Sequence, residues 1–108
     1  MGVHIQIDYR ERNTGILELL RNKNVVVEEG NLIIGDYFIN GHITVERKTT
    51  KDFILSLIDG RLFSQALRLK KHTETHIMVV EGIDLFHTGY DINPQAINGA
   101  IVSLSVSW

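Results

Sequence analysis

The sequence predicts an α/β domain in which a mixed β-sheet is flanked by helices. A length of 108 residues suits one compact core. The composition, 44% hydrophobic and 22% charged, is typical of a globular protein. Apolar residues recur with the two-residue period of strands in some segments and with the 3.6-residue period of helices in others. The predicted order, β-α-β-β-β-α-α-β-α, favours a mixed sheet covered by helices.

The first half of the chain carries most of the strand signals. Residues 3–8 alternate apolar and polar side chains, which predicts a strand that ends in a carboxylate. Asn13 or Thr14 can cap a short helix that follows, and residues 25–27 form a β-branched run typical of a strand. Two further strands, residues 32–39 and 43–47, flank the pair Asn40-Gly41, which is typical of a hairpin turn.

The second half carries most of the helix signals. A helix is expected from Thr50 to the break at Asp59-Gly60, and another over residues 61–71. Residues 76–80 predict a short buried strand. The last helix is expected to begin at Asn93-Pro94, because asparagine favours the N-cap and proline the first helical position. Its apolar face is expected to be core or subunit interface.

The composition excludes several kinds of site. The sequence has no cysteine, so neither a disulfide nor a thiolate metal site can form. No apolar stretch approaches the roughly 18 to 20 residues that span a bilayer, so we expect a cytoplasmic protein with no membrane partner. The net charge of −2 does not indicate a nucleic-acid binder by itself, although basic side chains cluster within residues 47–71.

Acidic and basic groups gather around the predicted hairpin in a pattern suited to phosphodiester hydrolysis. Asp36 and Glu46 can supply carboxylates for Mg²⁺ from adjacent strands. Lys48 lies two residues beyond Glu46, so its ammonium points to the same face and can hold an attacking water. Arg47 is expected to point to the opposite face, and Asp52 to lie in the first turn of the next helix.

The predicted site depends on the register of the hairpin. A two-residue turn at Asn40-Gly41 leaves Asp36 facing away from Glu46. A three-residue loop over residues 39–41 pairs Asp36 with Thr44 and returns the two carboxylates to one face. We predict that loop, or an equivalent bulge or bend. An ordinary solvated strand face with incidental ion pairs is the alternative interpretation of these charges.

The spacing of the charged residues resembles a known nuclease signature. The motif begins with Gly35-Asp36, continues after nine residues with Glu46-Arg47-Lys48, and ends after three more with Asp52. It resembles the GDX(n)ERKX(3)D motif of the XPF/Hef-type structure-specific nucleases, which is a form of the PD-(D/E)xK core. Residues 7–11 resemble the family's first strand and its D-x-R-E element. Phe53 to Ser56, Gly60-Arg61 and Gln65 resemble its DF…S…GR…Q stretch. The resemblance implies a restriction-endonuclease-like fold, with a central mixed sheet flanked by helices.

The resemblance also implies an activity and a set of site residues. It implies Mg²⁺- or Mn²⁺-dependent cutting of branched DNA (flaps, forks or junctions) in DNA repair or recombination. The implied metal ligands are Asp36, Glu46 and Asp8. Lys48 becomes the catalytic lysine, supported by Arg47 and Asp52. The residues implied to contact DNA are Arg10, Arg61, Gln65 and Arg68.

Partners and an alternative function follow from the same resemblance. It implies a homodimer, or a heterodimer with a related subunit, and a helix-hairpin-helix DNA-binding module supplied elsewhere. The family's dimerisation segment follows the position of Trp108, so residues 1–108 are expected to be a single nuclease domain that lacks it. Such an enzyme is expected at the nucleoid or in a nucleus. The alternative is a non-cutting DNA-binding or scaffold subunit, but such partners lose the acidic motif that this sequence keeps.

Overall fold

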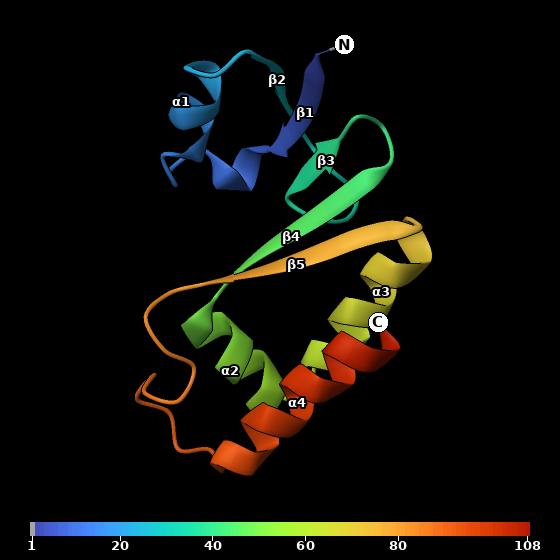
Figure 1. Cartoon of the computed structure of the whole chain (residues 1–108). Helices are drawn as coiled ribbons and strands as arrows, with labels where there is room; N and C mark the ends of the chain where they lie inside the picture. Colours follow the sequence, from blue (N-terminus) through green and yellow to red (C-terminus); the bar gives the residue numbers. More distant parts are fainter. Residues whose placement is uncertain (1) are drawn as a thin grey trace.

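The computed structural model describes residues 2–108, apart from the side chain of Ser107. Its centre is a five-stranded sheet with the order β2-β1-β3-β4-β5 (Figure 1). The strands are β1 (Val3–Asp8), β2 (Val25–Gly30), β3 (Tyr37–Ile39), β4 (Ile43–Thr49) and β5 (Thr75–Glu81). The helices are the short η1 (Tyr9–Glu11), α1 (Ile16–Arg21), α2 (Thr50–Ile58), α3 (Leu62–His72) and α4 (Pro94–Ser107). The predicted mixed sheet flanked by helices is confirmed.

Two parallel strand pairs form the outer parts of the sheet, and β3 joins them. β1 is parallel to β2 across α1, and β4 is parallel to β5 across α2 and α3. β3 is antiparallel to both β1 and β4, so β1 and β4 run in the same direction. Their carboxyl ends therefore meet at one edge of the sheet, which is where α/β proteins place their ligands.

The sheet carries a separate hydrophobic core on each face. On one face, α1 covers a core whose buried members are Ile5, Ile7, Leu17 and Tyr37. On the other face, α2, α3 and α4 lie together below β4 and β5 (Figure 1). The buried members of that core are Phe53, Ile54, Leu62, Ile97 and Ala100. None of the helices within residues 2–108 has the length and apolar character needed to cross a membrane.

Alternation along β4 decides which of its side chains face the three C-terminal helices. Val45 packs in the core beneath α1, so its neighbour Glu46 points to the opposite face. Met78, the partner of Glu46 on β5, packs against the helical core and agrees with this assignment. Glu46 and Lys48 therefore face the helices, whereas Arg47 faces away from them, as predicted.

Residues 32–36 form a loop where we predicted the first part of a strand, because β3 begins only at Tyr37. Gly35 bends the chain with a φ of 81°, in the left-handed region that favours glycine. A β-carbon at this position would lie 2.5 Å from Cγ2 of Thr44, so the close approach also requires glycine. The bend carries the backbone out of the sheet and toward the site described below.

The hairpin between β3 and β4 contains the extra residue that the site was predicted to need. Both residues of the 40–41 turn have positive φ, 51° and 77°, and the amide of His42 donates to the carbonyl of Ile39 at 3.1 Å. Pairing resumes between Ile39 and Ile43, so His42 is the inserted residue. The predicted loop over residues 39–41 was wrong in position, and the equivalent bulge is present.

Candidate active site

Strand β4 holds the two central carboxylates side by side. Continuing the register beyond the Tyr37–Val45 pair places Asp36 opposite Glu46. The amide of Asp36 donates to the carbonyl of Val45 at 2.8 Å. Its carboxylate Oδ2 accepts a hydrogen bond from the amide of Arg47, also at 2.8 Å. The buried Asp36 side chain is thus fixed by the backbone of the strand that carries Glu46.

The environment of Glu46 concentrates negative charge. Burial raises the pKa of Glu46 to about 7, and the neighbouring Asp36 carboxylate adds to the rise through its charge and a hydrogen bond. The positive charges of Lys48 and Arg10 oppose the rise without cancelling it. A proton or a cation can therefore neutralise this pair. Carboxylate oxygens are the ligands that Mg²⁺ and Mn²⁺ prefer, so Asp36 and Glu46 fit the metal that the resemblance implies.

Lys48 is oriented by a residue on α3. Its Nζ donates a hydrogen bond to Oε1 of Gln65 at 2.8 Å. A lysine ammonium has three N–H donors, so this contact fixes the side chain and leaves donors for other partners. The structure places the amide oxygen of Gln65 on Lys48, and the predicted contact of Gln65 with DNA stays a prediction.

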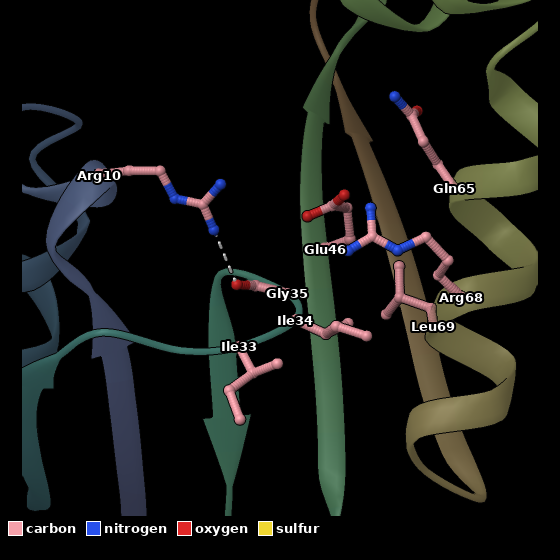
Figure 2. Close-up of a pocket in the computed structure, with 8 residues that line it drawn as sticks. All are labelled: Arg10, Ile33, Ile34, Gly35, Glu46, Gln65, Arg68 and Leu69. Carbon is pink, nitrogen blue, oxygen red and sulfur yellow. Dashed lines mark hydrogen bonds between the residues drawn. The ribbon is translucent and has the colours of Figure 1, made fainter.

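A pocket of about 210 Å³ opens between the loop before β3 and helix α3 (Figure 2). Glu46 lines it from β4, and Gln65 and Arg68 from α3. Arg10 lies on the other side, beyond the loop. The remaining lining residues are Ile33, Ile34, Gly35 and Leu69. The pocket combines a carboxylate, two guanidinium groups and an apolar wall.

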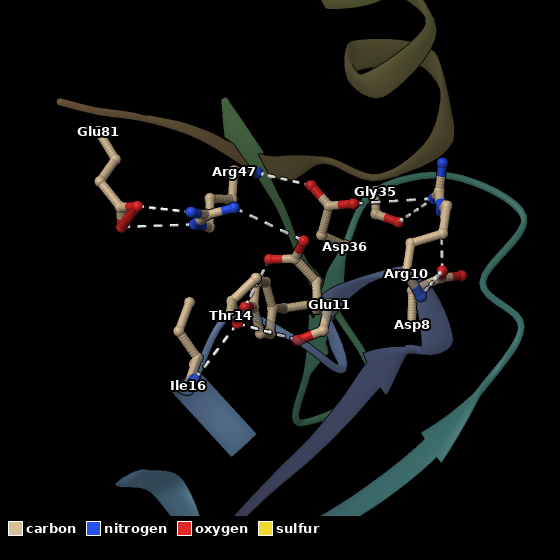
Figure 3. Close-up of polar contacts among 10 residues, drawn as sticks. Asp8, Arg10, Glu11, Thr14, Ile16, Gly35, Asp36, Arg47 and Glu81 are labelled. Carbon is tan, nitrogen blue, oxygen red and sulfur yellow. Dashed lines mark hydrogen bonds and ion pairs between the residues drawn. The ribbon is translucent and has the colours of Figure 1, made fainter. Parts of the chain in front are cut away.

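Asp8 lies at the end of β1, and its carboxylate is hydrogen-bonded to neighbouring groups. It accepts hydrogen bonds from the amide and Nε of Arg10, at 2.9 and 2.8 Å (Figure 3). It also accepts one from the amide of Leu32 at 2.8 Å. Burial alone would raise the pKa of Asp8, but these hydrogen bonds and the Arg10 charge outweigh it and lower the pKa. Arg10 also contacts the carbonyl of Gly35 at 3.3 Å and Oδ1 of Asp36 at 3.7 Å.

Asp8 does not join Asp36 and Glu46 in a three-carboxylate group. Within residues 2–108, no three His, Asp or Glu side chains are arranged to hold a metal ion. The structure brings two of the three predicted ligands together and places the third beside Arg10. The role of Asp8 as a metal ligand stays a prediction.

The side chain of Arg47 links elements on the far face of the sheet (Figure 3). Its guanidinium contacts Oε1 of Glu81 on β5 at 2.6 Å and Oε2 of Glu11 in η1 at 3.7 Å. The buried Glu11 carboxylate also accepts a hydrogen bond from the hydroxyl of Tyr37 at 2.7 Å. Glu11 lies in the D-x-R-E element of the sequence, but its contact with Arg47 was not predicted.

Two further predicted residues lie outside this cluster. Asp52 is exposed in the first turn of α2, where its amide donates to the N-cap hydroxyl of Thr49 at 3.1 Å. Its carboxylate contacts neither Asp36 nor Lys48 among the described residues. Arg61 is exposed at the start of α3 and pairs with Asp59 at 3.0 Å.

Comparison with known proteins shows the family to which this chain belongs. Residues 7–108, nearly the whole chain, match the ERCC4 domain. The chain belongs to the ERCC4 domain family. The predicted resemblance to XPF/Hef-type nuclease domains is therefore confirmed.

Several relatives of this ERCC4 domain have names that refer to an endonuclease or to DNA. It is 34% identical to the 3′-flap repair endonuclease Xpf of Saccharolobus solfataricus, over 100% of this chain and 46% of that protein. It is 39% identical to a Methanocaldococcus jannaschii protein named for an ATP-dependent RNA helicase, over 94% of this chain and 12% of that protein. The structure of XPF from Aeropyrum pernix in complex with DNA superposes with a TM-score of 0.87 and 36% identity, over 97% of this chain and 52% of that chain. This ERCC4 domain thus spans about half or less of each relative.

Proposed function

We propose that this ERCC4 domain is a divalent-metal-dependent endonuclease that hydrolyses phosphodiester bonds in branched DNA. The observation that carries the proposal is the pairing of Asp36 with Glu46, whose raised pKa marks a site that a cation can occupy. The names of the relatives, a flap endonuclease and an XPF bound to DNA, support the same substrate class.

The two carboxylates would hold Mg²⁺ or Mn²⁺ as ligands. A cation bound there supplies Lewis-acid stabilisation for the charge that develops on the phosphate during hydrolysis. Asp8 and Arg10 support the site by fixing the loop and the carboxylate next to it.

Lys48 is proposed to hold the attacking water. Gln65 takes one N–H donor of Lys48 and directs the ammonium, while a second donor can bind the water oxygen. The positive charge also offsets negative charge that grows on the phosphate in the transition state. An amide oxygen suits the task of Gln65 because it positions the lysine without neutralising it.

Basic side chains around the pocket are proposed to contact the DNA backbone. Arg10 and Arg68 line the pocket and can bind phosphate oxygens with the paired donors of a guanidinium. Arg61 is exposed at the start of α3 and is proposed to contact a more distant phosphate. The dimer and the helix-hairpin-helix module implied for the whole protein stay predictions.

Cleavage of an end-labelled DNA fork or flap with Mg²⁺ or Mn²⁺ tests the proposal. Asp36→Ala and Lys48→Ala are each expected to lower the rate by at least about a hundredfold, in the range seen when a group that stabilises the transition state is removed. Glu74→Ala and Lys23→Ala remove exposed charges of the same kinds away from the pocket and serve as matched controls.

The outcomes separate an enzyme from a binding subunit. Loss of cleavage in the two site variants, with normal rates in both controls, supports the proposal. Equal cleavage by all five proteins would show that another site or a contaminant cuts the DNA. DNA binding by the wild type without cleavage would favour the scaffold alternative.

A further inference from the structure

An exposed aliphatic side chain stands beside the candidate active site. Ile33 is 87% exposed, although isoleucine is among the residues most often buried. Single exposed apolar side chains are common on proteins and need no explanation by themselves. Ile33 differs because it lines the same pocket as Glu46, Gln65 and Arg68 (Figure 2).

The backbone on both sides of Ile33 is held in place. One residue before it, the amide of Leu32 donates to Oδ2 of Asp8 at 2.8 Å. Two residues after it, the carbonyl of Gly35 accepts from Nη2 of Arg10 at 3.3 Å. The next amide is bound to β4 by the hydrogen bond to Val45 described above. The loop therefore presents Ile33 at a fixed place and does not leave it to move freely with solvent.

The pocket has two chemically different walls. Arg10 and Arg68 are cationic and suit a phosphate, whereas Ile33, Ile34 and Leu69 are apolar. A nucleotide has the same two parts, a charged phosphate and a flat base with apolar faces. The volume of about 210 Å³ lies below the roughly 300 to 1,000 Å³ of drug-sized sites and suits one part of a nucleotide.

We propose that Ile33, with Ile34 and Leu69, forms a subsite for an unstacked nucleobase next to the phosphate that is cut. This inference rests on the proposed endonuclease function. A paired base is stacked on both faces and must leave the duplex before it can pack on an isoleucine. An unpaired base at a branch has already lost those contacts. The subsite therefore selects scissile phosphates that adjoin an unpaired nucleotide, by binding the base and not by reading its edge.

Removing the base from the DNA and removing the Ile33 side chain should each slow cleavage by the same factor, and combining the two changes should slow it no further. The test uses fork DNA with one abasic nucleotide placed at each position beside the cut. Wild-type cleavage is expected to fall about tenfold at one of these positions, the range for losing an apolar contact in a pocket. Ile33→Ser is expected to cut the intact fork about tenfold more slowly and to show no further loss on the abasic fork.

Ile83→Ser is the matched control. Ile83 is 103% exposed in the loop after β5 and does not line this pocket. It should cut both forks as the wild type does. Ile33→Phe, which keeps an apolar surface, should restore discrimination between the intact and abasic forks. An Ile33→Ser variant that cuts the intact fork normally, or that loses a further tenfold on the abasic fork, would overturn the subsite.

A binding measurement separates this inference from the proposed function. With metal chelated, the fluorescence anisotropy of 2-aminopurine at the responsive position should rise when the wild type binds the fork, because the subsite restricts the motion of the unpaired base. Ile33→Ser should bind without that rise. Absence of cleavage by the wild type overturns the endonuclease function, whereas a rise that is equal in wild type and Ile33→Ser overturns the subsite.

Discussion

The backbone amide of Arg47 donates a hydrogen bond to Oδ2 of Asp36 at 2.8 Å. Strand β4 therefore carries Glu46 and Lys48 and also fixes the carboxylate that precedes β3. The side chain of the same arginine lies on the opposite face, between Glu11 and Glu81. One residue thus links the site to the far side of the sheet.

Arg47→Ala should destabilise the protein through the charge it leaves behind. The side chain of Glu11 is only 8% exposed, so without Arg47 its carboxylate stays buried with no cation beside it. We expect the free energy of unfolding to fall by about 1 to 3 kcal/mol. Urea denaturation measures the change.

Glu81→Ala provides the comparison, because it removes an exposed partner of the same arginine. Its effect should be small, as for other exposed ion pairs. Glu11→Gln combined with Arg47→Ala should be more stable than Arg47→Ala alone, since no buried charge is then left unpaired. Equal losses for the Arg47 and Glu81 variants would contradict this account.

Glu46 should make the metal-free protein less stable as the pH rises. Its pKa is raised to about 7 by burial and by Asp36, above the ordinary value of 4.5. The folded protein therefore favours the protonated form of Glu46. The resulting contribution to the free energy of unfolding is fully present below pH 4.5 and is lost as the pH rises through about 7. Glu46→Gln, which resembles the protonated form, should match the wild type at pH 4.5 and be more stable at pH 8, by on the order of 1 kcal/mol after allowance for solvent screening.

Thermal melting in a chelating buffer at both pH values measures that difference. Glu74→Gln, an exposed change of the same kind, should shift neither melting temperature. Mn²⁺ should raise the melting temperature of the wild type more at pH 8 than at pH 5.5, because the metal competes with the proton on Glu46. A Glu46→Gln variant that is stabilised equally at both pH values would contradict the explanation that burial and the charge of Asp36 raise the pKa of Glu46.

Gln65→Leu should slow catalysis without weakening DNA binding. The substitution removes the oxygen that holds Lys48 at 2.8 Å. We expect kcat to fall about tenfold, the lower range for losing a residue that orients an active-site group, with little change in KM. Steady-state cleavage of a fork measures both constants, and Ser64→Ala on the same helix is the control. A rise in KM with kcat unchanged would support the earlier prediction that Gln65 contacts DNA.

The fold was largely predictable because each long element has a clear period and a clear end. Residues 32–36 were not, because their apolar run resembles a strand. A loop forms there because Gly35 bends the chain, the amide of Leu32 donates to distant Asp8, and Arg10 donates to the carbonyl of Gly35. That Asp36 and Glu46 share one face followed from strand geometry once one residue was inserted in the hairpin. The predicted pairing of Asp36 with Thr44 was wrong, because the insertion lies after Gly41 and places Asp36 opposite Glu46. Gln65 lies 17 residues from Lys48, and their contact depends on how α3 packs on the sheet, which no local pattern reports.

Asp8→Asn tests whether this acid serves the loop or the metal. Asp8 fixes Arg10 and the amide of Leu32, so the variant should lower the free energy of unfolding by about 1 to 3 kcal/mol and expose the loop to hydrogen exchange. Asp84→Asn is the control, since Asp84 caps an amide in a loop away from the pocket. Calorimetric titration with Mn²⁺ then measures the metal affinity of the wild type and of Asp8→Asn.

A loop-fixing role predicts that metal affinity in Asp8→Asn changes by less than about tenfold, whereas loss of a direct ligand removes a charged oxygen and should cost more. Because hydrogen bonds lower the pKa of Asp8 below its ordinary value of 3.8, its contribution to stability is present above that pH and is lost as the pH falls through the lowered pKa. The stability difference between wild type and variant should therefore shrink only in strong acid. A large loss of metal affinity with unchanged stability would make Asp8 a ligand rather than a support for the loop.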